Sequence, residues 1–532
     1  MNATFPTRAT EPTMMEVSRR RLLALLGLGA STAAVAACSG RTGSGNRAGG
    51  RIRLAMLQPP RSGLNPLSDD AFKLSRWATA ETLINLDAEG NAVAGLATAW
   101  EQQSDDPNTW RLTLREGVTF HDGTALDATR AAACLTFAAG YSTPPRVLDG
   151  TSLTATADGS TLIVTTGSPD PLLPQRLSSP QLAILAAAAY PSDSTGAVNP
   201  VGHGTGPFTL TKVNGTAGAT LERNEKYWGK KAAAPGIDVT FVPDGTARGA
   251  ALRTGDADLV EAVPVSQAAT LDEALLHEVP MPRTATLYLN TRSGAFADTA
   301  LRAAVRDAVD PAALVTGVYE GHADAAAGLL GPALSWAAQQ RSWGSTTYAG
   351  NGGAAASGKV SGAATAGTVP SGTAVTLASY TDRPELAEIV GLLTEQLKKA
   401  GFTVTQDIRE YSQMEADALA GKFDMVLLSR ATVLDSGDPV AYMVSDFSST
   451  ESFALSFLAD PAVDQALTTA GATAAGPERQ KAVMAAEQAI LATGAAVPLL
   501  HERVLQGEAS GLKGAERDPR ERALITPATA LT

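Results

Sequence analysis

The stretch TWRLTLREGVTFHDG, residues 109–123, says most about how this chain folds. Apolar and polar side chains alternate from Trp110 to Leu114, and a period of two turns one face of a strand inward. The pair Asp122-Gly123 at the end of the stretch is typical of a turn. The stretch therefore predicts a half-buried strand that runs toward a turn.

Two further segments predict strands of the same kind. Residues 237–242 alternate in the same way. Residues 161–166 are rich in β-branched side chains and follow the turn pair Asp158-Gly159. The first half of the chain is therefore expected to hold short strands between Gly and Pro turns.

An amphipathic helix is predicted in the second half of the chain. Its apolar side chains recur at helical spacing, at Leu386, Ile389, Val390, Leu393 and Leu397. Asp382 lies near the expected N-cap, Pro384 lies in the first turn, and Gly401 lies beyond the end.

Strands are expected after this helix at residues 402–404 and 425–428. Further helices are expected at residues 298–309, stopped by Pro311, and 478–492, opened by Pro477. This alternation of helices and strands is typical of an α/β lobe.

Length and charge narrow the class of protein. A chain of 532 residues is too long for one compact core, and two to four domains are expected. Hydrophobic residues make up 44% and charged residues 18%, which fits a folded body. The net charge of −12 argues against nucleic acid as a partner, because binding phosphate needs clustered Lys and Arg. We expect a monomer.

The N-terminal residues predict export. Arg19, Arg20 and Arg21 precede an apolar run that ends at Cys38 and is short for a membrane span. The sequence Val-Ala-Ala-Cys at 35–38 resembles the bacterial lipobox, which implies a signal peptide at 1–37 and a lipid on Cys38 rather than a buried or free thiol. Export by the general or the twin-arginine route stays open. The protein is thus expected outside the cytoplasm, anchored to the outer face of the cell membrane.

A run rich in Gly, Ser and Arg follows Cys38, and residues 38–53 are interpreted as a flexible linker. Residues 343–372 consist almost entirely of Gly, Ala, Ser and Thr, and they are interpreted as a low-complexity surface insertion.

Several blocks, taken in order, carry a family resemblance. They are Asn65-Pro66-Leu67, Glu81-Thr82-Leu83, residues 95–101, the stretch 109–123, Gly206-Pro207-Phe208, residues 221–229, residues 251–259, residues 288–291 and residues 301–305. Together they resemble the peptide and nickel family of ABC-importer solute-binding proteins. The insertion at 343–372 departs from the family pattern.

The resemblance implies an α/β, periplasmic-binding-protein-like fold. Two large lobes would flank a hinge cleft, and a smaller lobe would be inserted in the N-terminal half. The first lobe would comprise residues 54–80, 202–285 and 497–532, the inserted lobe 81–201, and the second lobe 286–496. The hinge would lie near residues 286–290 and 496–502, so that closure around a solute is a hinge motion.

Five side chains are candidates for the binding site. The loop Asp435-Ser436-Gly437-Asp438-Pro439 resembles the family loop whose aspartate pairs with a peptide ammonium, and Asp438 is favoured over Asp435. The same residues also suit a plain turn. Arg430 would hold a carboxylate or serve the structure alone, and Tyr442 and Phe72 would line the cleft or pack in the core.

The resulting hypothesis is a binding protein that passes a small, peptide-like solute to the permease of an ABC importer, without a cofactor. A metal site is not expected, because the five His include no suitably spaced pair. A secreted hydrolase is the alternative, but the sequence has no Gly-x-Ser-x-Gly, and Leu505 stands where a second zinc-binding His would follow His501-Glu502. A third possibility is a binding protein that serves a sensor.

Overall fold

The fold is seen in a computed structural model that describes residues 48–341, 361–381, 383–433, 436–451 and 453–532. Residues 48–532 form one compact unit. The predicted signal peptide, Cys38, Asp382, Asp435 and most of the predicted insertion lie outside the described residues. The last part of that insertion, residues 361–372, has no regular secondary structure.

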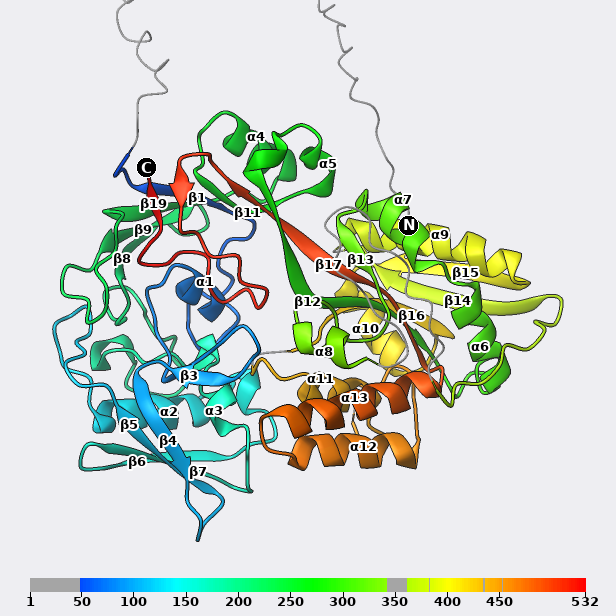
Figure 1. Cartoon of the computed structure of the whole chain (residues 1–532), viewed down its shortest axis with the longest axis horizontal. Helices are drawn as coiled ribbons and strands as arrows, with labels where there is room; N and C mark the ends of the chain where they lie inside the picture. The colour runs from blue at the N-terminus through cyan, green and yellow to red at the C-terminus, as the bar shows by residue number, and fades with distance from the viewer. Residues whose placement is uncertain (1–47, 342–360, 382, 434–435, 452) are drawn as a thin grey trace, which may run out of the picture. The chain divides into compact units, whose positions relative to one another are not determined.

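One mixed sheet of eleven strands forms the frame of the molecule (Figure 1). Its order is β15-β14-β16-β12-β17-β11-β1-β10-β9-β8, and β13 pairs with β17 beside this path. The strands are β1 (Ile52–Met56), β8 (Phe208–Val213), β9 (Gly218–Arg223), β10 (Gly236–Phe241), β11 (Leu259–Val263), β12 (Leu276–Leu289), β13 (Ala323–Ala325), β14 (Thr373–Tyr380), β15 (Phe402–Arg409), β16 (Met425–Ala431) and β17 (Ala496–Glu508).

The first strand corrects one predicted boundary. β1 begins at Ile52, inside the linker predicted for residues 38–53, and Ile52 is fully buried. Arg51 already forms ion pairs with Glu222 and Asp238, so the folded body starts before residue 54. Alternation alone missed this because the strand is buried on both sides along most of its length.

A separate antiparallel sheet has the order β4-β5-β7-β6. Its strands are β4 (Ala97–Gln102), β5 (Thr109–Leu114), β6 (Leu153–Asp158) and β7 (Thr161–Thr166), and helix α2 (Ala128–Ala139) packs on β6 and β7. The strands predicted at 110–114 and 161–166 are confirmed. Two small hairpin-like pairs join β2 (Ile84–Leu86) to β3 (Ala92–Ala94) and β18 (Leu512–Lys513) to β19 (Ala530–Leu531).

The long strands β12 and β17 connect the two halves of the large sheet. They pair antiparallel from Leu276 opposite Gly507 to Tyr288 opposite Ala496. At one end β17 pairs with β11, and at the other end β12 pairs with β16 from Arg283 onward. The predicted hinge segments lie within these two strands except for Asn290, which follows the end of β12, and their flexing stays a prediction.

The helices cover the sheets and follow the predicted periodicity. They are α1 (Ala71–Arg76), α2, α3 (Leu173–Arg176), α4 (Gly245–Arg253), α5 (Val265–Ala268), α6 (Thr299–Ala308), α7 (Pro311–Tyr319), α8 (Ser335–Gln340), α9 (Pro384–Lys399), α10 (Tyr411–Leu419), α11 (Val440–Phe447), α12 (Pro461–Ala472) and α13 (Pro477–Ala492). Short 3₁₀ turns occupy 146–148, 180–182, 187–189 and 273–275. The helices predicted at 298–309, 386–397 and 478–492 are confirmed as α6, α9 and α13. All five apolar side chains named for α9 are buried.

Buried apolar side chains form two large clusters, and the end of β12 and the start of β17 belong to the first of them. One contains residues of β14, β16 and α9, such as Leu377, Leu427 and Leu393. The other contains β1 and β10 together with the separate sheet, for example Leu54 and Leu162. The two-lobed fold is thus built on two cores, and the four-stranded sheet shares its core with the first lobe.

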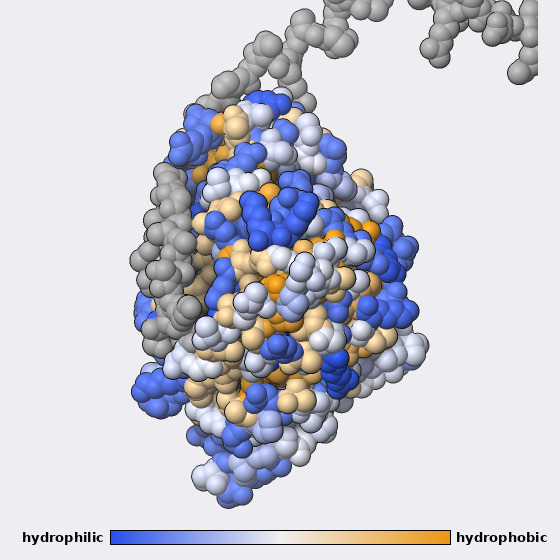
Figure 2. Space-filling model, turned by 90° about the vertical axis from the view of Figure 1, so that its right-hand side faces the viewer, coloured by the Kyte–Doolittle hydropathy of each residue, from blue (hydrophilic) through white to orange (hydrophobic). Residues whose placement is uncertain are grey.

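Polar and apolar residues are intermingled on the face that Figure 2 shows. Among the described residues, the exposed large apolar side chains are Val93, Leu392 and Leu419. No helix in the described ranges has the length and hydropathy that crossing a membrane requires.

Candidate functional site

Asp438 precedes helix α11 and is bound within the second lobe. Its Oδ1 accepts a hydrogen bond from the backbone N–H of Val440 at 2.9 Å. Arg479 of α13 donates to both carboxylate oxygens, at 2.8 and 2.9 Å. The carboxylate is therefore neutralised inside the protein, and its predicted role toward a solute ammonium stays a prediction.

The loop that carries Asp438 nevertheless lies against residues assigned to the inserted lobe and to the first lobe. A Cβ atom on Gly437 would collide with the side chain of Leu86 and would lie 3.9 Å from Arg520. A Cβ on Gly90 would lie 3.6 Å from the carbonyl oxygen of Gly437. Gly437 also has a φ of 73°, which favours glycine, so both its backbone and its surroundings demand a residue without a side chain. This loop belongs to the junction between the lobes.

Arg430 is held by an internal carboxylate. It donates to both oxygens of the fully buried Asp446, at 2.9 and 2.6 Å, and its guanidinium lies 4.3 Å from the ring centroid of Phe453. Burial disfavours the charged guanidinium, but Asp446 outweighs it and raises the pKa of Arg430. This geometry accords with the structural alternative for Arg430.

The two predicted aromatic residues differ in exposure. Tyr442 is fully buried in α11, where its ring meets Phe447 edge-on. Burial raises the pKa of its hydroxyl. Phe72 is part-buried in α1, the same helix that ends at Arg76. Only Phe72 of this pair is open to solvent as the structure stands.

A group of charged side chains that the sequence interpretation missed lies at the lobe junction. We call Arg76, Arg283 and Arg383 the arginine cluster. Arg76 ends α1, Arg283 lies in the long strand β12, and Arg383 precedes α9. Arg76 and Arg283 contact Glu521, which belongs to the loop before the C-terminus, and the charge of Arg383 also acts on this carboxylate.

Glu521 is the residue that two members of the arginine cluster, Arg76 and Arg283, share. Nη2 of Arg76 donates to its Oε1 at 3.1 Å, and Nε of Arg76 donates to its backbone carbonyl at 2.7 Å. Nη2 of Arg283 lies 4.0 Å from its Oε2. Burial would raise the pKa of Glu521, but the charges of Arg76, Arg283 and Arg383 outweigh it and lower that pKa.

Two members of the cluster have other carboxylate partners. Arg76 forms an ion pair with Glu261 of β11, whose other oxygen accepts the backbone N–H of Leu57 at 2.7 Å. Arg383 forms an ion pair with Glu502 of β17, which also accepts from the hydroxyl of Ser429. Glu502 raises the pKa of Arg383 although burial acts against it.

Arg283 is the member with unused hydrogen-bonding capacity. Its Nε is buried, and no described residue offers that atom an acceptor. Its only ion pair to a described residue is the 4.0 Å approach to Glu521, which is longer than a hydrogen bond. A guanidinium presents five donors in a fixed fork that matches a carboxylate. The site is therefore suited to an anionic group.

One signal in the sequence pointed to this cluster. Arg383 stands directly before Pro384 at the start of α9, where the helix dipole disfavours a positive charge. An arginine in that place needs another partner, which Glu502 supplies. Arg283 and Glu521 gave no comparable signal, because 283 and 521 are far apart in the chain.

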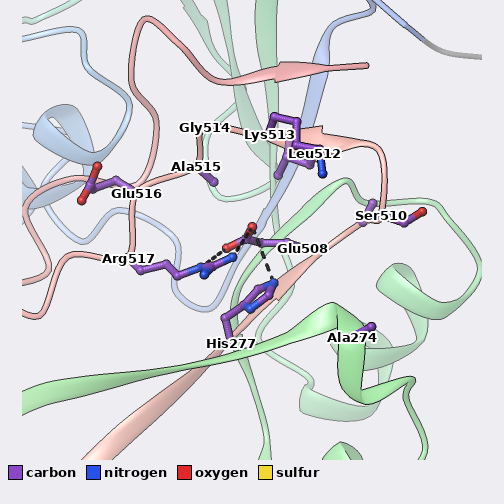
Figure 3. A pocket seen from close by; sticks show the side chains of 11 residues that line it. Ala274, His277, Glu508, Ser510, Leu512, Lys513, Gly514, Ala515, Glu516 and Arg517 are labelled. Atoms are coloured by element: carbon purple, nitrogen blue, oxygen red, sulfur yellow. Dashed lines mark hydrogen bonds and ion pairs between the residues drawn. The ribbon is translucent and has the colours of Figure 1, made fainter.

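Two surface pockets lie outside this cluster. The first, about 460 Å³, is lined by residues around Glu508, and Arg517 and His277 both point toward that carboxylate (Figure 3). Arg517 donates to it at 2.8 Å, and His277 lies 3.7 Å away. The second, about 510 Å³, is lined by residues that include Arg292, Arg302 and Asp460. Neither pocket nor any other described region gathers three His, Cys, Asp or Glu side chains that could hold a metal ion.

Comparison with known proteins gives a family match. The model of the bacterial extracellular solute-binding proteins, family 5 Middle, matches residues 91–454. The nickel-binding periplasmic protein of Escherichia coli K12 is 29% identical over 276 residues, 48% of this chain and 51% of that protein. The glutathione-binding protein GsiB of Salmonella paratyphi A is 31% identical over 255 residues, 45% and 48% of the two chains. The chain thus spans about half the length of these relatives.

Solved structures show the same fold. The nickel ABC transporter protein of Bacillus halodurans has a TM-score of 0.73 at 23% identity, covering 91% of this chain and 100% of that one. DppA of Helicobacter pylori with the peptide STSA has a TM-score of 0.68 at 18% identity, covering 91% and 99%. The unliganded open form of the murein tripeptide-binding protein MppA has a TM-score of 0.70 at 19% identity, covering 90% and 97%.

Proposed function

Because this chain belongs to family 5 of the bacterial extracellular solute-binding proteins, we propose that it captures a peptide or peptide-like solute between its lobes and delivers it to an ABC importer. The observation that carries this proposal is the arginine cluster. It lies where the two lobes meet, and Arg283 retains donors that no described residue uses. A solute with an anionic group would supply the missing acceptor.

The architecture supports capture by closure. Two cores are connected through β12 and β17, and the sheet passes from one lobe to the other through this pair. A hinge motion about a few strand residues moves one lobe against the other without disturbing either core. A solute that contacts both lobes stabilises the closed state, because it has more contacts there than in the open state.

Thermal unfolding with a solute panel tests the binding function. The full-length protein is heated with tripeptides, a nickel–histidine chelate or oligosaccharides, and a ligand that binds only the folded form raises the melting temperature. At a concentration of about 100 times Kd the stabilisation is about 2.7 kcal/mol. If none of these solutes raises the melting temperature, the proposed function is wrong.

Delivery to a permease is the second part of the proposal. The matching family and the similar structures are binding proteins, which favours a role in import over hydrolysis for this chain. A sensor partner would leave the binding step unchanged. Affinity purification from cross-linked cells distinguishes the two: recovery of a permease supports delivery, whereas recovery of a sensor protein in its place contradicts it.

Lipid attachment at Cys38 is the third part. The sequence Val-Ala-Ala-Cys at 35–38 supports it, and several acyl chains would hold the protein at a membrane surface. Labelling cells with a radioactive fatty acid should mark the wild-type protein and leave Cys38→Ser unlabelled. Equal labelling of the two proteins, or none of either, would overturn the anchor.

A further inference from the structure

We infer that the carboxylate of Glu521 occupies the place of an anionic group of the solute and competes with that group for Arg283. The inference rests on the proposed function and deepens it. It assigns a chemical class to the solute, a molecule with at least one carboxylate, and it gives the C-terminal loop a part in setting affinity. In the absence of solute, the protein supplies its own counter-charge.

Glu521 contacts Arg76 closely and Arg283 only loosely, so a solute carboxylate could replace it at Arg283. Arg76 holds the residue by two hydrogen bonds, at 3.1 Å to the side chain and 2.7 Å to the backbone. The side chain of Arg283 approaches only to 4.0 Å, and its buried Nε has no hydrogen-bond acceptor among the described residues. The internal carboxylate therefore balances the charge of Arg283 without filling its donors. A solute carboxylate placed closer would gain a bidentate contact that Glu521 does not make.

The backbone of Glu521 is strained. Its φ is 58°, in the left-handed region that a residue with a side chain seldom adopts. The turn that imposes this conformation is well built: Glu521 donates its N–H to the carbonyl of Asp518 at 3.1 Å, and the Asp518 carboxylate accepts the N–H of Arg520 and Arg522 at 2.9 and 2.8 Å. Glycine would fit this position without strain. A strained position that carries a carboxylate points to a functional role.

Solvent reaches this group of side chains. The side chains of Glu521, Arg283 and Arg383 are 31%, 27% and 33% exposed. The ion pair of Arg503 with Asp324, between β17 and β13, is different, because these side chains are only 1% and 2% exposed. A solute can enter the first group without unfolding anything, whereas the second is closed and serves the fold.

A purely structural role for Glu521 is the competing explanation. Glu521 lies in the C-terminal loop of the first lobe, and Arg383 lies in the second lobe, so the carboxylate would tie the lobes together. Under that explanation its removal lowers stability and does not improve affinity for any solute. Under the competition proposed here, removal improves affinity for carboxylate-bearing solutes alone.

The test compares two tripeptide libraries. The free library has C-terminal carboxylates. The blocked library has C-terminal amides, and its side-chain carboxyls are blocked as well. Binding of each to the full-length protein is measured by calorimetry at one ionic strength. We expect the free library to bind at least tenfold more tightly than the blocked library. Glu521→Gln should lower the Kd for the free library several-fold, and Arg283→Gln should raise it tenfold or more.

Two further variants make the result decisive. Glu521→Gly removes the carboxylate and fits the positive φ, so it should show the same gain in affinity even if Glu521→Gln folds poorly. Glu516→Gln, five residues earlier in the same loop, should bind as the wild type does.

Equal binding of free and blocked libraries would overturn the inference, as would an unchanged or weaker affinity in both Glu521 variants. If only an uncharged oligosaccharide binds, the inference and the peptide-like class of solute are both wrong, while solute capture stands. If no tripeptide, nickel–histidine chelate or oligosaccharide binds, the proposed function fails with it.

Discussion

The guanidinium of Arg479 in α13 donates hydrogen bonds to both carboxylate oxygens of Asp438, 41 residues earlier in the chain, at 2.8 and 2.9 Å. The same guanidinium donates to the backbone carbonyls of Ala470 and Thr473, at the end of α12. Its side chain is 5% exposed. One arginine thus fastens the junction loop to two helices of the second lobe.

Replacing this arginine should destabilise the protein strongly. Arg479→Met leaves Asp438, whose side chain is 12% exposed, without its counter-charge, and it leaves the carbonyls at the end of α12 without a donor. Breaking a buried pair from one side costs about 3–5 kcal/mol. Urea unfolding followed by circular dichroism measures the loss.

Lys481→Met on the same helix is the matched control. Lys481 pairs with Glu478, but these side chains are 65% and 77% exposed, and such surface pairs contribute about 0–1 kcal/mol. A similar loss of stability in the two variants would show that the contact with Asp438 does not hold the loop.

His501 should make stability depend on pH. It is fully buried in β17, and burial, aided by the charge of Arg341, lowers its pKa to about 3. The hydroxyl of Thr284 donates to the carbonyl of Leu329 at 2.7 Å, so its oxygen accepts from Nδ1–H of His501 at 2.9 Å. The folded protein therefore holds a neutral imidazole with the proton on Nδ1.

The sign follows from where the proton binds. Between the ordinary His pKa of about 6.5 and the folded pKa of about 3, the unfolded chain binds a proton at His501 and the folded chain does not. Stability from this residue is complete above pH 6.5 and falls by about 1.4 kcal/mol per pH unit below it. By pH 5 the loss should be about 2 kcal/mol.

Chemical denaturation at pH 7, 6 and 5 measures this dependence, with His501→Asn as the reference. Asparagine can still donate to Thr284 but does not titrate. The difference in the free energy of unfolding between the wild type and the variant should therefore shrink as the pH falls. A difference that stays constant across this range would mean that His501 is not neutral in the folded state.

Neighbouring leucines of α9 should respond very differently to truncation. Leu393 is fully buried in the core of the second lobe, whereas Leu392 is 37% exposed. Leu393→Ala should cost about 2–5 kcal/mol, because it removes buried methyl groups and leaves a cavity. Leu392→Ala should cost about 0.5 kcal/mol or less. Comparable losses in calorimetric unfolding would contradict the orientation of α9.

The sequence predicted those elements whose pattern is local. The periodicity from Leu386 to Leu397 gave α9 because a helix repeats its buried face every three or four residues. Alternation around Trp110 gave β5 for the analogous reason. The order of the family blocks predicted the two-lobed fold. The family model, which matches residues 91–454, agrees with that prediction.

The site was less predictable because its contacts are not local. The role of Arg430 toward a solute carboxylate stays a prediction, and the sequence did not show that Arg430 donates to Asp446, sixteen residues later on α11. Glu521 meets Arg76 across 445 residues of sequence. Nothing in a single sequence shows which of many charges will meet at a lobe junction. Only the fold brings them together.

Lobe closure is the central claim, and the distance between the lobes tests it most directly. Spin labels at Arg253→Cys in α4 and Thr469→Cys in α12, on exposed positions of the two lobes, report that distance in a protein whose Cys38 and Cys134 are replaced by alanine. Pulsed electron resonance is recorded with and without a solute that raises the melting temperature. We predict that the solute shortens and narrows the distance distribution, and that Arg283→Gln abolishes the change at the same solute concentration. A distribution that the bound solute leaves unaltered would contradict the account.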